Sequence, residues 1–422
     1  MLLRFQVANH RSILEPVELS LIAVDEDRAA TRGFDRLSER VLTVAGIYGP
    51  NASGKSNVLG ALAWLSMAVG TSLRGWEEEI PRDAHRFGEG SASPSKFDLD
   101  LMVGGVRYTY GLEVDDSAVL YESLDSYPER RRRNLFTRDG NEVEFRRGLD
   151  GARAIRELLT PTTLALSAAT RVGESNVRAV GRAIAGMGIL GLRRQVSRKD
   201  TFSDSTIRLF LEKHGKDELR LSDSPQAQPL AAEALQVLSL LRLADPGIND
   251  YEIVEDSRGR LFRPHFRCVH RGEDKAVSLE FEDESAGTRT WFHLLGPALA
   301  ALRNGRNLLF DEIDASLHPR LSARLIEIFQ DPQTNPHGAQ LVFTSHDASL
   351  LNTLNRDEVW LTEKESDGGT RLVALAEFGG ERVRKSLNLE RAYLQGRFGS
   401  IPEVDQVQVR RALGLISRPQ DG

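Results

Sequence analysis

The sequence predicts an α/β protein with a parallel sheet, a set of antiparallel strands and a mostly helical insertion between them. After residue 285, short apolar stretches of strand length alternate with longer stretches that have helical spacing, which is typical of a parallel α/β sheet. Residues 97–114 alternate apolar and polar side chains around Gly104-Gly105, a pattern typical of a hairpin. From about residue 150 to residue 243 this alternation disappears, and Ala, Leu and Arg recur at helical spacing.

The composition is that of a globular protein with two or three packed units. The chain has 422 residues, of which 40% are hydrophobic and 27% are charged. The net charge of −6 gives no overall signal for nucleic-acid binding, although a local basic patch stays open. A single cysteine, Cys268, excludes a disulfide framework and favours a cytoplasmic setting. No apolar run approaches the roughly 18 residues of a membrane helix, so we expect no membrane partner.

We expect the main α/β unit of the protein, called the head below, to be built from two parts of the chain. The first part spans residues 1–148. Its polar stretch at 25–40 is expected to be a loop, and 75–96 a second, longer loop. The other elements expected here are two short strands within 1–24, a buried strand at 41–48, a helix at 56–69, and the hairpin of 97–114 followed by further strands to about residue 145.

The rest of the chain is expected to divide into a mostly helical insertion, residues 149–245, and a second half of the head, residues 246–422. Strands resume near 251–254 and 262–269. The elements expected beyond these are a helix at 291–302, a strand at 307–310, a helix at 321–330, and strands at 340–344 and 358–362.

A phosphate-binding loop (Walker A) is predicted at residues 49–56, GPNASGKS, which fit G-x-x-x-x-G-K-[ST]. Its two glycines permit backbone angles that turn amides toward phosphate oxygens, and the N-terminus of the following helix favours an anion. In this motif the lysine reaches the β- and γ-phosphates and the serine binds Mg²⁺. We therefore predict ATP and Mg²⁺ as ligands. The predicted contacts are Gly49, Pro50, Asn51, Ala52, Ser53, Gly54, Lys55, Ser56 and Asn57.

Two acids follow the apolar stretch 307–310. In a protein that also has a phosphate loop, one carboxylate at such a strand end holds the metal and its neighbour activates water. We therefore assign Asp311 to Mg²⁺, together with Ser56, and Glu312 to the general base.

Two further stretches of sequence narrow the class of phosphate-loop protein that this chain resembles. ESAGTRT, residues 284–290, opens an apolar helix at which Ser285 and Gly287 are expected to present a hydroxyl and amides to a phosphate. LVFTSHD, residues 341–347, places His346 just past another apolar strand, about 35 residues after Asp311. We predict that His346 contacts the γ-phosphate, which completes a catalytic set with Lys55 and Glu312.

This ordered set resembles the ATP-binding cassette (ABC) ATPases: phosphate loop, signature helix, acidic strand, a D-loop-like segment at 314–317, and a switch histidine. The long interval between Lys55 and Asp311 is similar to that of the SMC, break-repair and OLD-nuclease branch. The opening FQVANHRSI is similar to the start of that branch, with His10 in an aromatic position. This similarity implies an ABC-type ATPase head, with a mixed sheet and an antiparallel β lobe, and implies that Arg11 lies near the nucleotide.

A closer resemblance is to the compact ABC-like AAA ATPases of prokaryotic phage-defence operons, such as the RloA and PtuA groups. This resemblance depends on four stretches of sequence: GIYGPNASGKSN, ESAGTRTWFHLL, FDEIDASLHP and LERAYLQGRFGSIP. The signature differs from the transporter form LSGGQ, having Glu284 and Ala286 where Leu and the first Gly stand. The resemblance covers roughly residues 1–115 and 250–402, and it places neither a glutamine loop nor the adenine contacts.

The resemblance implies a homodimer or higher oligomer in which one subunit supplies the phosphate loop and acids and the other supplies Ser285 and Gly287. It implies ATP hydrolysis that controls a partner effector, such as a nuclease, in antiviral defence. Three alternatives stay open: a self-contained OLD-like nuclease, a DNA-repair ATPase of the SMC type, and a transporter motor. A nuclease would need a D-x-D pair, for which the chain offers Asp98 and Asp100 within early strands.

Three other segments bear on partners. PERRRRN, residues 128–134, and RRQVSRKD, residues 193–200, are rich in arginine. We expect both stretches to form solvated surface, and the alternative is that they contact nucleic acid or a protein. The tail at 389–402 is expected to pack on the head, with docking of a partner as the alternative.

Overall fold

The structure is a computed structural model of the chain, and it describes residues 1–147, 149–192, 206, 232–255, 262–269, 276–315, 317–378 and 388–398. The second arginine-rich stretch, residues 193–200, lies outside the described residues. So does the end of the predicted tail, residues 399–402.

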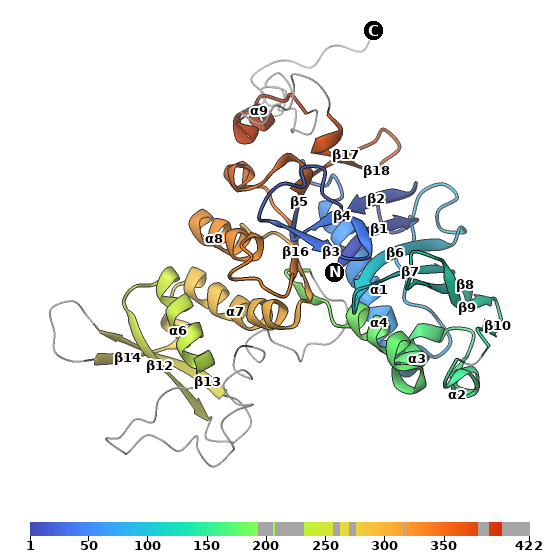
Figure 1. Cartoon of the computed structure of the whole chain (residues 1–422). Coiled ribbons are helices and arrows are strands. Elements are labelled where there is room, and N and C mark those ends of the chain that lie inside the picture. The colour runs from blue at the N-terminus through green and yellow to red at the C-terminus, as the bar shows by residue number, and fades with distance from the viewer. Residues whose placement is uncertain are drawn as a thin grey trace, which may run out of the picture.

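A six-stranded mixed sheet forms the centre of the protein (Figure 1). Its strands pair in parallel except for the last, which runs antiparallel to its neighbour. In spatial order they are β11 (Gly188–Leu190), β15 (Asn307–Phe310), β16 (Gln340–Thr344), β5 (Val44–Tyr48), β17 (Val359–Lys364) and β18 (Thr370–Ala374).

A seven-stranded antiparallel sheet forms the second lobe. In order its strands are β10 (Glu142–Phe145), β9 (Arg133–Asp139), β8 (Val119–Tyr127), β7 (Val106–Val114), β6 (Ser95–Val103), β1 (Leu2–Ala8) and β2 (Val17–Ser20). β6 and β7 form the predicted hairpin, and Gly104 and Gly105 at its turn have φ angles of 57° and 75°. The predicted combination of a mixed sheet with an antiparallel β lobe is confirmed.

The helices form layers on both sides of the mixed sheet. α1 (Lys55–Gly75) lies between the two sheets and contacts α3 (Ala165–Val172) and α4 (Ser175–Ala185). α7 (Ala286–Asn304) and α8 (Pro319–Gln330) cover the opposite face.

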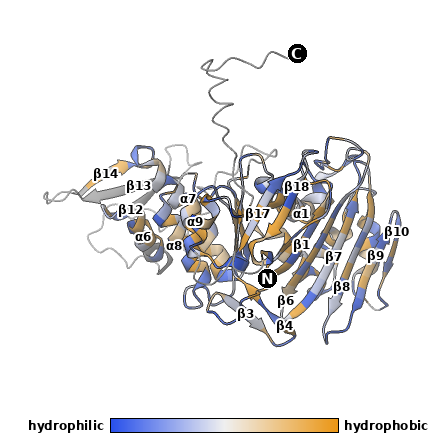
Figure 2. Cartoon of the chain, turned by 90° about the horizontal axis from the view of Figure 1, so that it is seen from above, coloured by the Kyte–Doolittle hydropathy of each residue, from blue (hydrophilic) through white to orange (hydrophobic). Residues whose placement is uncertain are grey.

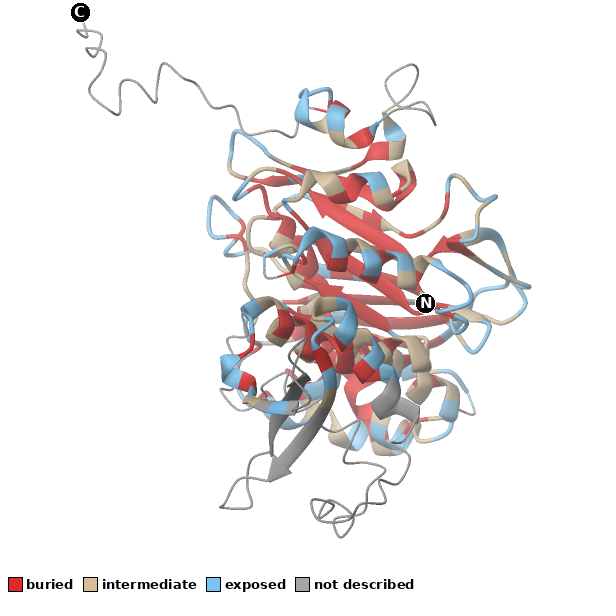
Figure 3. Ribbon diagram, turned by 90° about the vertical axis from the view of Figure 1, so that its left-hand side faces the viewer, coloured by how far each residue is buried: buried red, intermediate tan, exposed pale blue. Residues whose placement is uncertain are grey.

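The strands of the mixed sheet are buried on both faces, as parallel strands are (Figure 3). Leu309 of β15 packs into the core around α1, whereas its neighbours Leu308 and Phe310 pack into the core under α7 and α8. Figure 2 shows the alternation of hydrophilic and hydrophobic residues along the strands of the antiparallel lobe.

A small satellite unit follows the insertion. It is the antiparallel sheet β12 (Ile248–Glu255), β13 (Phe262–Val269) and β14 (Ala276–Glu280) with α6 (Ala232–Ala244). The indole Nε1 of Trp291 on α7 donates to the carbonyl of Leu240 on α6 at 2.7 Å, which joins this unit to α7. α9 (Leu389–Leu394) lies beside residues 348–353.

The segment 149–192, within the insertion expected to be mostly helical, contains three helices and one short strand that the sequence did not reveal. After α2 (Ala152–Leu158), α3 and α4 it forms β11, which pairs in parallel with β15 and extends the central sheet. Helical spacing of Ala and Leu is visible in the sequence, but a strand of three residues is too short to show a period.

The stretch 25–40 also differs from the expected loop. It contains most of a hairpin of β3 (Thr31–Phe34) and β4 (Leu37–Leu42). Four of these ten strand residues are charged or glycine, and much of the hairpin faces solvent, so neither face has the apolar period that would identify a strand.

One described helix, α1, is long and apolar enough to cross a membrane by length and composition. In this structure 56% of its most apolar window is buried inside the protein. A core helix of a globular protein meets the same criteria, so this observation is weak evidence for a span.

Glu358 gives the fold a pH dependence. Its carboxylate is fully buried, 3.0 Å from Arg28 Nη1, and accepts from Gln330 Nε2 and the Asn355 amide. Burial raises the pKa of Glu358 from 4.5 to about 7, against the opposing effect of Arg28. Because the folded state binds this proton more tightly than the unfolded chain, the contribution of Glu358 is full below pH 4.5 and is lost as pH rises through 7.

We therefore expect the free energy of unfolding of the wild type, relative to Glu358→Gln, to fall by up to about 3 kcal/mol between pH 4.5 and pH 8. Urea unfolding of both proteins across that range measures the difference. A difference that grows with pH would show that the charged pair with Arg28 is the stabilising form.

Candidate active site

The predicted phosphate loop connects β5 to α1, so it lies at the carboxyl end of a central parallel strand. Gly49 and Gly54 have φ angles of 152° and 103°. A side chain at Gly49 would collide with Thr362, and one at Gly54 would collide with Thr370. Only glycine fits these two positions.

Two threonines on the β17–β18 hairpin brace this loop. The Thr362 and Ser53 hydroxyls are 2.6 Å apart, and the Thr370 hydroxyl donates to the Ser53 carbonyl at 3.1 Å. The same Thr370 hydroxyl lies 2.7 Å from Ser12, which accepts from Asn57 Nδ2 at 2.6 Å. Side chains from an early segment of the chain and from the β17–β18 hairpin therefore hold the loop in shape.

Lys55 lies inside the loop, with 5% of its surface exposed. Its Nζ donates to the carbonyls of Gly49 at 2.8 Å and Pro50 at 3.0 Å, and lies 3.5 Å from His346 Nδ1. Burial lowers the pKa of Lys55 to about 8, although the acids of the site oppose this shift. A buried ammonium held mainly by backbone carbonyls is suited to an anionic ligand.

Asp311 lies directly beside the first turn of α1. Its Oδ1 accepts from the Ser56 hydroxyl at 2.9 Å and from the Thr344 hydroxyl at 2.6 Å. Its amide donates to the Leu190 carbonyl of β11 at 2.9 Å. The two predicted metal ligands, Ser56 and Asp311, are therefore in contact although 255 positions separate them.

Glu312 has an unusual backbone conformation. Its φ is 53°, in the left-handed region that non-glycine residues rarely adopt. Its amide donates to the Thr344 hydroxyl at 2.7 Å, the same hydroxyl that donates to Asp311. This bond holds the strained turn, and the Glu312 side chain is exposed to solvent.

His346 is placed by Asp314, within the predicted D-loop-like segment. Asp314 accepts from the Ser345 hydroxyl at 2.7 Å and from the His346 amide at 3.2 Å. The phosphate loop, both acids and His346 therefore meet at the carboxyl ends of β5, β15 and β16, which are adjacent in the sheet.

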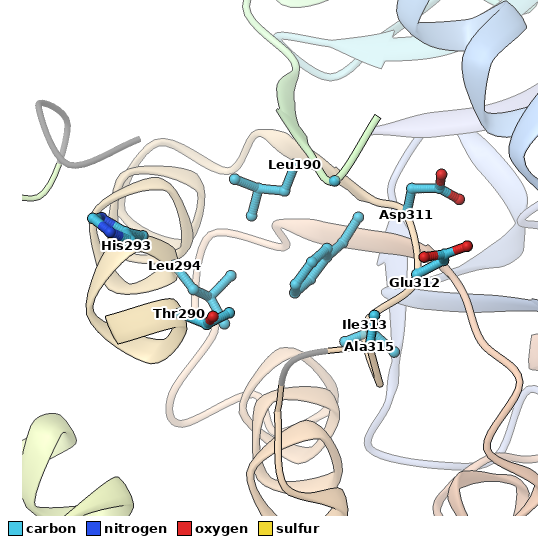
Figure 4. Close-up of a pocket in the computed structure, with 10 residues that line it drawn as sticks. Leu190, Thr290, His293, Leu294, Asp311, Glu312, Ile313 and Ala315 are labelled. Carbon is cyan, nitrogen blue, oxygen red and sulfur yellow. The ribbon is translucent and has the colours of Figure 1, made fainter. Parts of the chain in front are cut away.

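A cavity of about 340 Å³ adjoins the acids on the side of α7 (Figure 4). Its wall is largely apolar, with Leu190, Leu294 and Ile313, and it includes Thr290 and His293 of α7 as well as Asp311 and Glu312. Burial lowers the pKa of His293, so this ring is neutral at pH 7.

Ser285 caps the start of α7, accepting from the Thr288 amide at 3.0 Å. Across the residues that the structure describes, no hydrogen bond joins Ser285 or Gly287 to the loop at 49–57. The predicted signature is thus formed as a helix start, and it does not complete the site within one chain.

Farther along, α7 contains Pro297, and a side chain from another segment is inserted into the helix there. The Thr206 hydroxyl donates to the Phe292 carbonyl at 2.7 Å and accepts from the Gly296 amide at 3.0 Å. A side chain at Gly296 would collide with the backbone of Thr206. The Gly296 amide and the Phe292 carbonyl, which a regular helix would bond directly, are therefore linked through the Thr206 hydroxyl.

Arg11 lies beside α1, and its guanidinium would be 3.3 Å from a Cβ at Gly60. Its Nε and Nη2 both lie 3.0 Å from Asp83 Oδ2, and its φ is 52°. The predicted nucleotide contact of Arg11 stays a prediction.

The other acidic pair considered from the sequence lies elsewhere. Asp98 and Asp100 are on β6, in the antiparallel lobe. Asp100 accepts from Arg107 Nη2 and, at 2.7 Å, from the Thr109 hydroxyl. Across the described part of the chain, no group of three or more His, Cys, Asp or Glu side chains is arranged to hold a metal ion.

Sequence reasoning missed the side chains that support the site. Thr344 stands within LVFTSHD, and its place at a strand end beside the acids was a usable signal. Thr362 and Thr370 had none, because the pairing of β17 with β5 brings Thr362 to the loop and the pairing of β18 with β17 brings Thr370 there.

The family described as "AAA domain, putative AbiEii toxin, Type IV TA system" matches residues 44–352. No curated protein matches the chain. Among solved structures, the chain is similar to the SMC head domain from Thermotoga maritima, at 13% identity and a TM-score of 0.40, covering 88% of this chain and 98% of that one.

A second similar structure is an SmcHead bound to the C-winged helix domain of ScpA, at 12% identity and a TM-score of 0.44, covering 88% of this chain and 97% of that one. The family match spans most of the chain, from β5 through the loop at 49–57, the strand that ends before Asp311, and His346. The chain belongs to this AAA family.

Proposed function

We propose that this chain binds and hydrolyses ATP in a dimer with two shared sites and thereby controls a partner effector in antiviral defence. The observation that carries the catalytic part is the 2.9 Å contact between Ser56 and Asp311. This contact, together with Lys55 and His346, gathers the predicted hydrolytic residues at one edge of the sheet.

The side chains present fit Mg²⁺. A serine hydroxyl and a carboxylate are the hard oxygen ligands that this ion prefers, with phosphates and water at its remaining positions. When bound, Mg²⁺ would neutralise charge on the phosphates.

The residues of the site have separate roles in ATP hydrolysis. Lys55 and the amides at the start of α1 hold the phosphates, because a buried cation and unpaired N–H groups favour anions. Glu312 accepts the proton of the attacking water, and the Thr344 hydroxyl keeps its backbone in place. His346, 3.5 Å from Lys55 Nζ, contacts the terminal phosphate.

The shared site has a direct test. We expect Lys55→Ala and Ser285→Arg each to abolish turnover, and an equal mixture of the two to regain about a quarter of wild-type activity. In the mixed dimer, the Ser285→Arg subunit keeps its own Lys55 and receives an intact Ser285 from the Lys55→Ala subunit. Steady-state phosphate release measures the recovery, and Gly287→Arg should behave as Ser285→Arg does.

The matched control is a mixture of Lys55→Ala with Glu312→Gln. Both changes lie in the half-site that one subunit supplies, so neither site of the mixed dimer is intact and no activity should return. Recovery in the control, or none in the test mixture, would contradict a site shared between subunits.

The defence role rests on the resemblance to phage-defence ATPases and on the family description, which names a putative toxin of a Type IV toxin–antitoxin system. We place the protein in the cytoplasm on the basis of its single cysteine. Native purification of the chain from infected and uninfected cells, in the presence of ATP, tests this role. Recovery of a nuclease or toxin subunit in defined stoichiometry is expected, and purification of the chain alone in both states would count against it.

A further inference from the structure

Positive charge is concentrated in one part of this acidic protein. Residues 128–192 contain twelve arginines, no lysine and seven acidic residues, whereas the whole chain has a net charge of −6. Arg138 is buried and Arg178 is half-buried, and the other ten arginines are exposed. The excess is therefore a property of the surface.

Seven of these arginines belong to one corner of the antiparallel lobe, which we call the arginine corner: Arg130, Arg131, Arg132, Arg133, Arg146, Arg147 and Arg171. The first four occupy the β8–β9 turn and the start of β9. The Arg146 amide donates to the Leu135 carbonyl of β9 at 2.9 Å, which brings the end of β10 to the same place.

The end of α3 completes the arginine corner. Arg146 Nη2 lies 3.7 Å from Glu174, the residue that precedes α4. Gly151 lies against the carbonyl of Val172, next to Arg171. Figure 1 shows β8, β9, β10 and α3 together on the side of the molecule opposite α7 and α8.

Only part of this charge is neutralised within the chain. Arg132 Nη2 pairs with Asp125 at 2.9 Å, and Arg133 lies 3.9 Å from Glu129. Across the described residues, the other four arginines of the corner make no ion pair: Arg130, Arg131, Arg147 and Arg171. Four exposed guanidinium groups are thus available to an external anion.

We propose that the arginine corner binds the phosphate backbone of double-stranded DNA. Guanidinium groups match phosphate oxygens bidentately, and several of them along one edge suit a repeated anion. A protein interface would need an apolar centre, and Val172 is the one large apolar side chain exposed at this corner, at 39%. No exposed aromatic side chain stands among its described residues to stack on unpaired bases, which favours a duplex over a single strand.

The test measures binding of a fluorescein-labelled DNA duplex, two to three helical turns long, to the full chain by anisotropy. The test variant is Arg130→Gln/Arg131→Gln/Arg147→Gln, at about 0.1 M salt. We expect this variant to bind at least about tenfold more weakly, and the slope of log Kd against log salt to fall by about 3.

The matched control is Arg36→Gln/Arg320→Gln/Arg324→Gln, which removes the same charge from exposed positions outside the corner. It should change Kd by less than about twofold. Equal weakening by both variants, or no binding of the duplex by the wild type, would overturn the proposal. So would binding of polyglutamate or of phosphatidylserine vesicles in place of the duplex, since these stand for an acidic protein and a membrane.

Both variants should keep the circular-dichroism spectrum and basal ATPase rate of the wild type, because the side chains changed are exposed and outside the site. DNA binding measured without ATP does not depend on hydrolysis. A failure of DNA binding can therefore be distinguished from a failure of the proposed ATPase function.

Discussion

Glu312→Gln should lower the rate of ATP hydrolysis by on the order of 100-fold or more while ATP still binds. The amide keeps the size of the side chain but accepts no proton at neutral pH. Because Lys55, Ser56 and Asp311 remain in place, the dissociation constant for ATP should stay within a few-fold of the wild-type value. Single-turnover phosphate release and equilibrium binding of a fluorescent ATP analogue measure the two quantities separately.

The same variant should also prolong the dimer in ATP, because contacts across the shared nucleotide persist until hydrolysis removes them. Light scattering during size-exclusion chromatography in ATP and in ADP reports this. Thr344→Val is the companion variant, since it removes the hydroxyl that holds both acids and leaves the Glu312 carboxylate present. Wild-type turnover in Glu312→Gln would remove Glu312 from its role.

Glu122→Ala should destabilise the fold by about 3 to 5 kcal/mol. Glu122 is fully buried on β8 and accepts from the amides of Ala165 and Leu166 at 2.6 and 2.8 Å, and from the Tyr110 hydroxyl at 2.9 Å. Its charge also faces the buried Arg138. Truncation leaves two helix amides and a hydroxyl without their acceptor.

Urea unfolding measures the loss, and two variants control for it. Glu122→Gln keeps acceptor oxygen at the start of α3 and loses only the charge, so its cost should be clearly smaller. Glu113→Ala removes a carboxylate whose partner is the exposed Lys96, and it should cost less than about 1 kcal/mol. A cost of under about 1 kcal/mol for Glu122→Ala would mean that water replaces the carboxylate in this core.

The sequence predicts the central elements well where they are long or carry a motif. The strand at 340–344 and the strand at 307–310 have their predicted bounds, because each is a continuous apolar run between polar residues. The convergence of Ser56 with Asp311 follows from the motif order, since the carboxyl ends of parallel strands lie on one edge.

The features that the sequence did not reveal depend on tertiary contacts. β11 has only three residues, and its identity comes from pairing with β15. The shape of the phosphate loop depends on Thr370, which is more than 300 positions away along the chain. No glycine in the sequence indicates the left-handed turn at Glu312, and the hydroxyl of Thr344 on the neighbouring strand holds this turn.

The hydroxyl step in α7 has a mechanical consequence. At Pro297 the helix lacks one backbone donor, and the adjacent amide-to-carbonyl link is routed through Thr206. With one donor missing and one link made by a side chain, α7 has fewer backbone hydrogen bonds of its own at this point than elsewhere along its length, and a helix bends most easily where such bonds are missing. We therefore expect a displacement of Thr206 to bend α7 there and to shift Ser285, at the start of the helix, relative to the sheet.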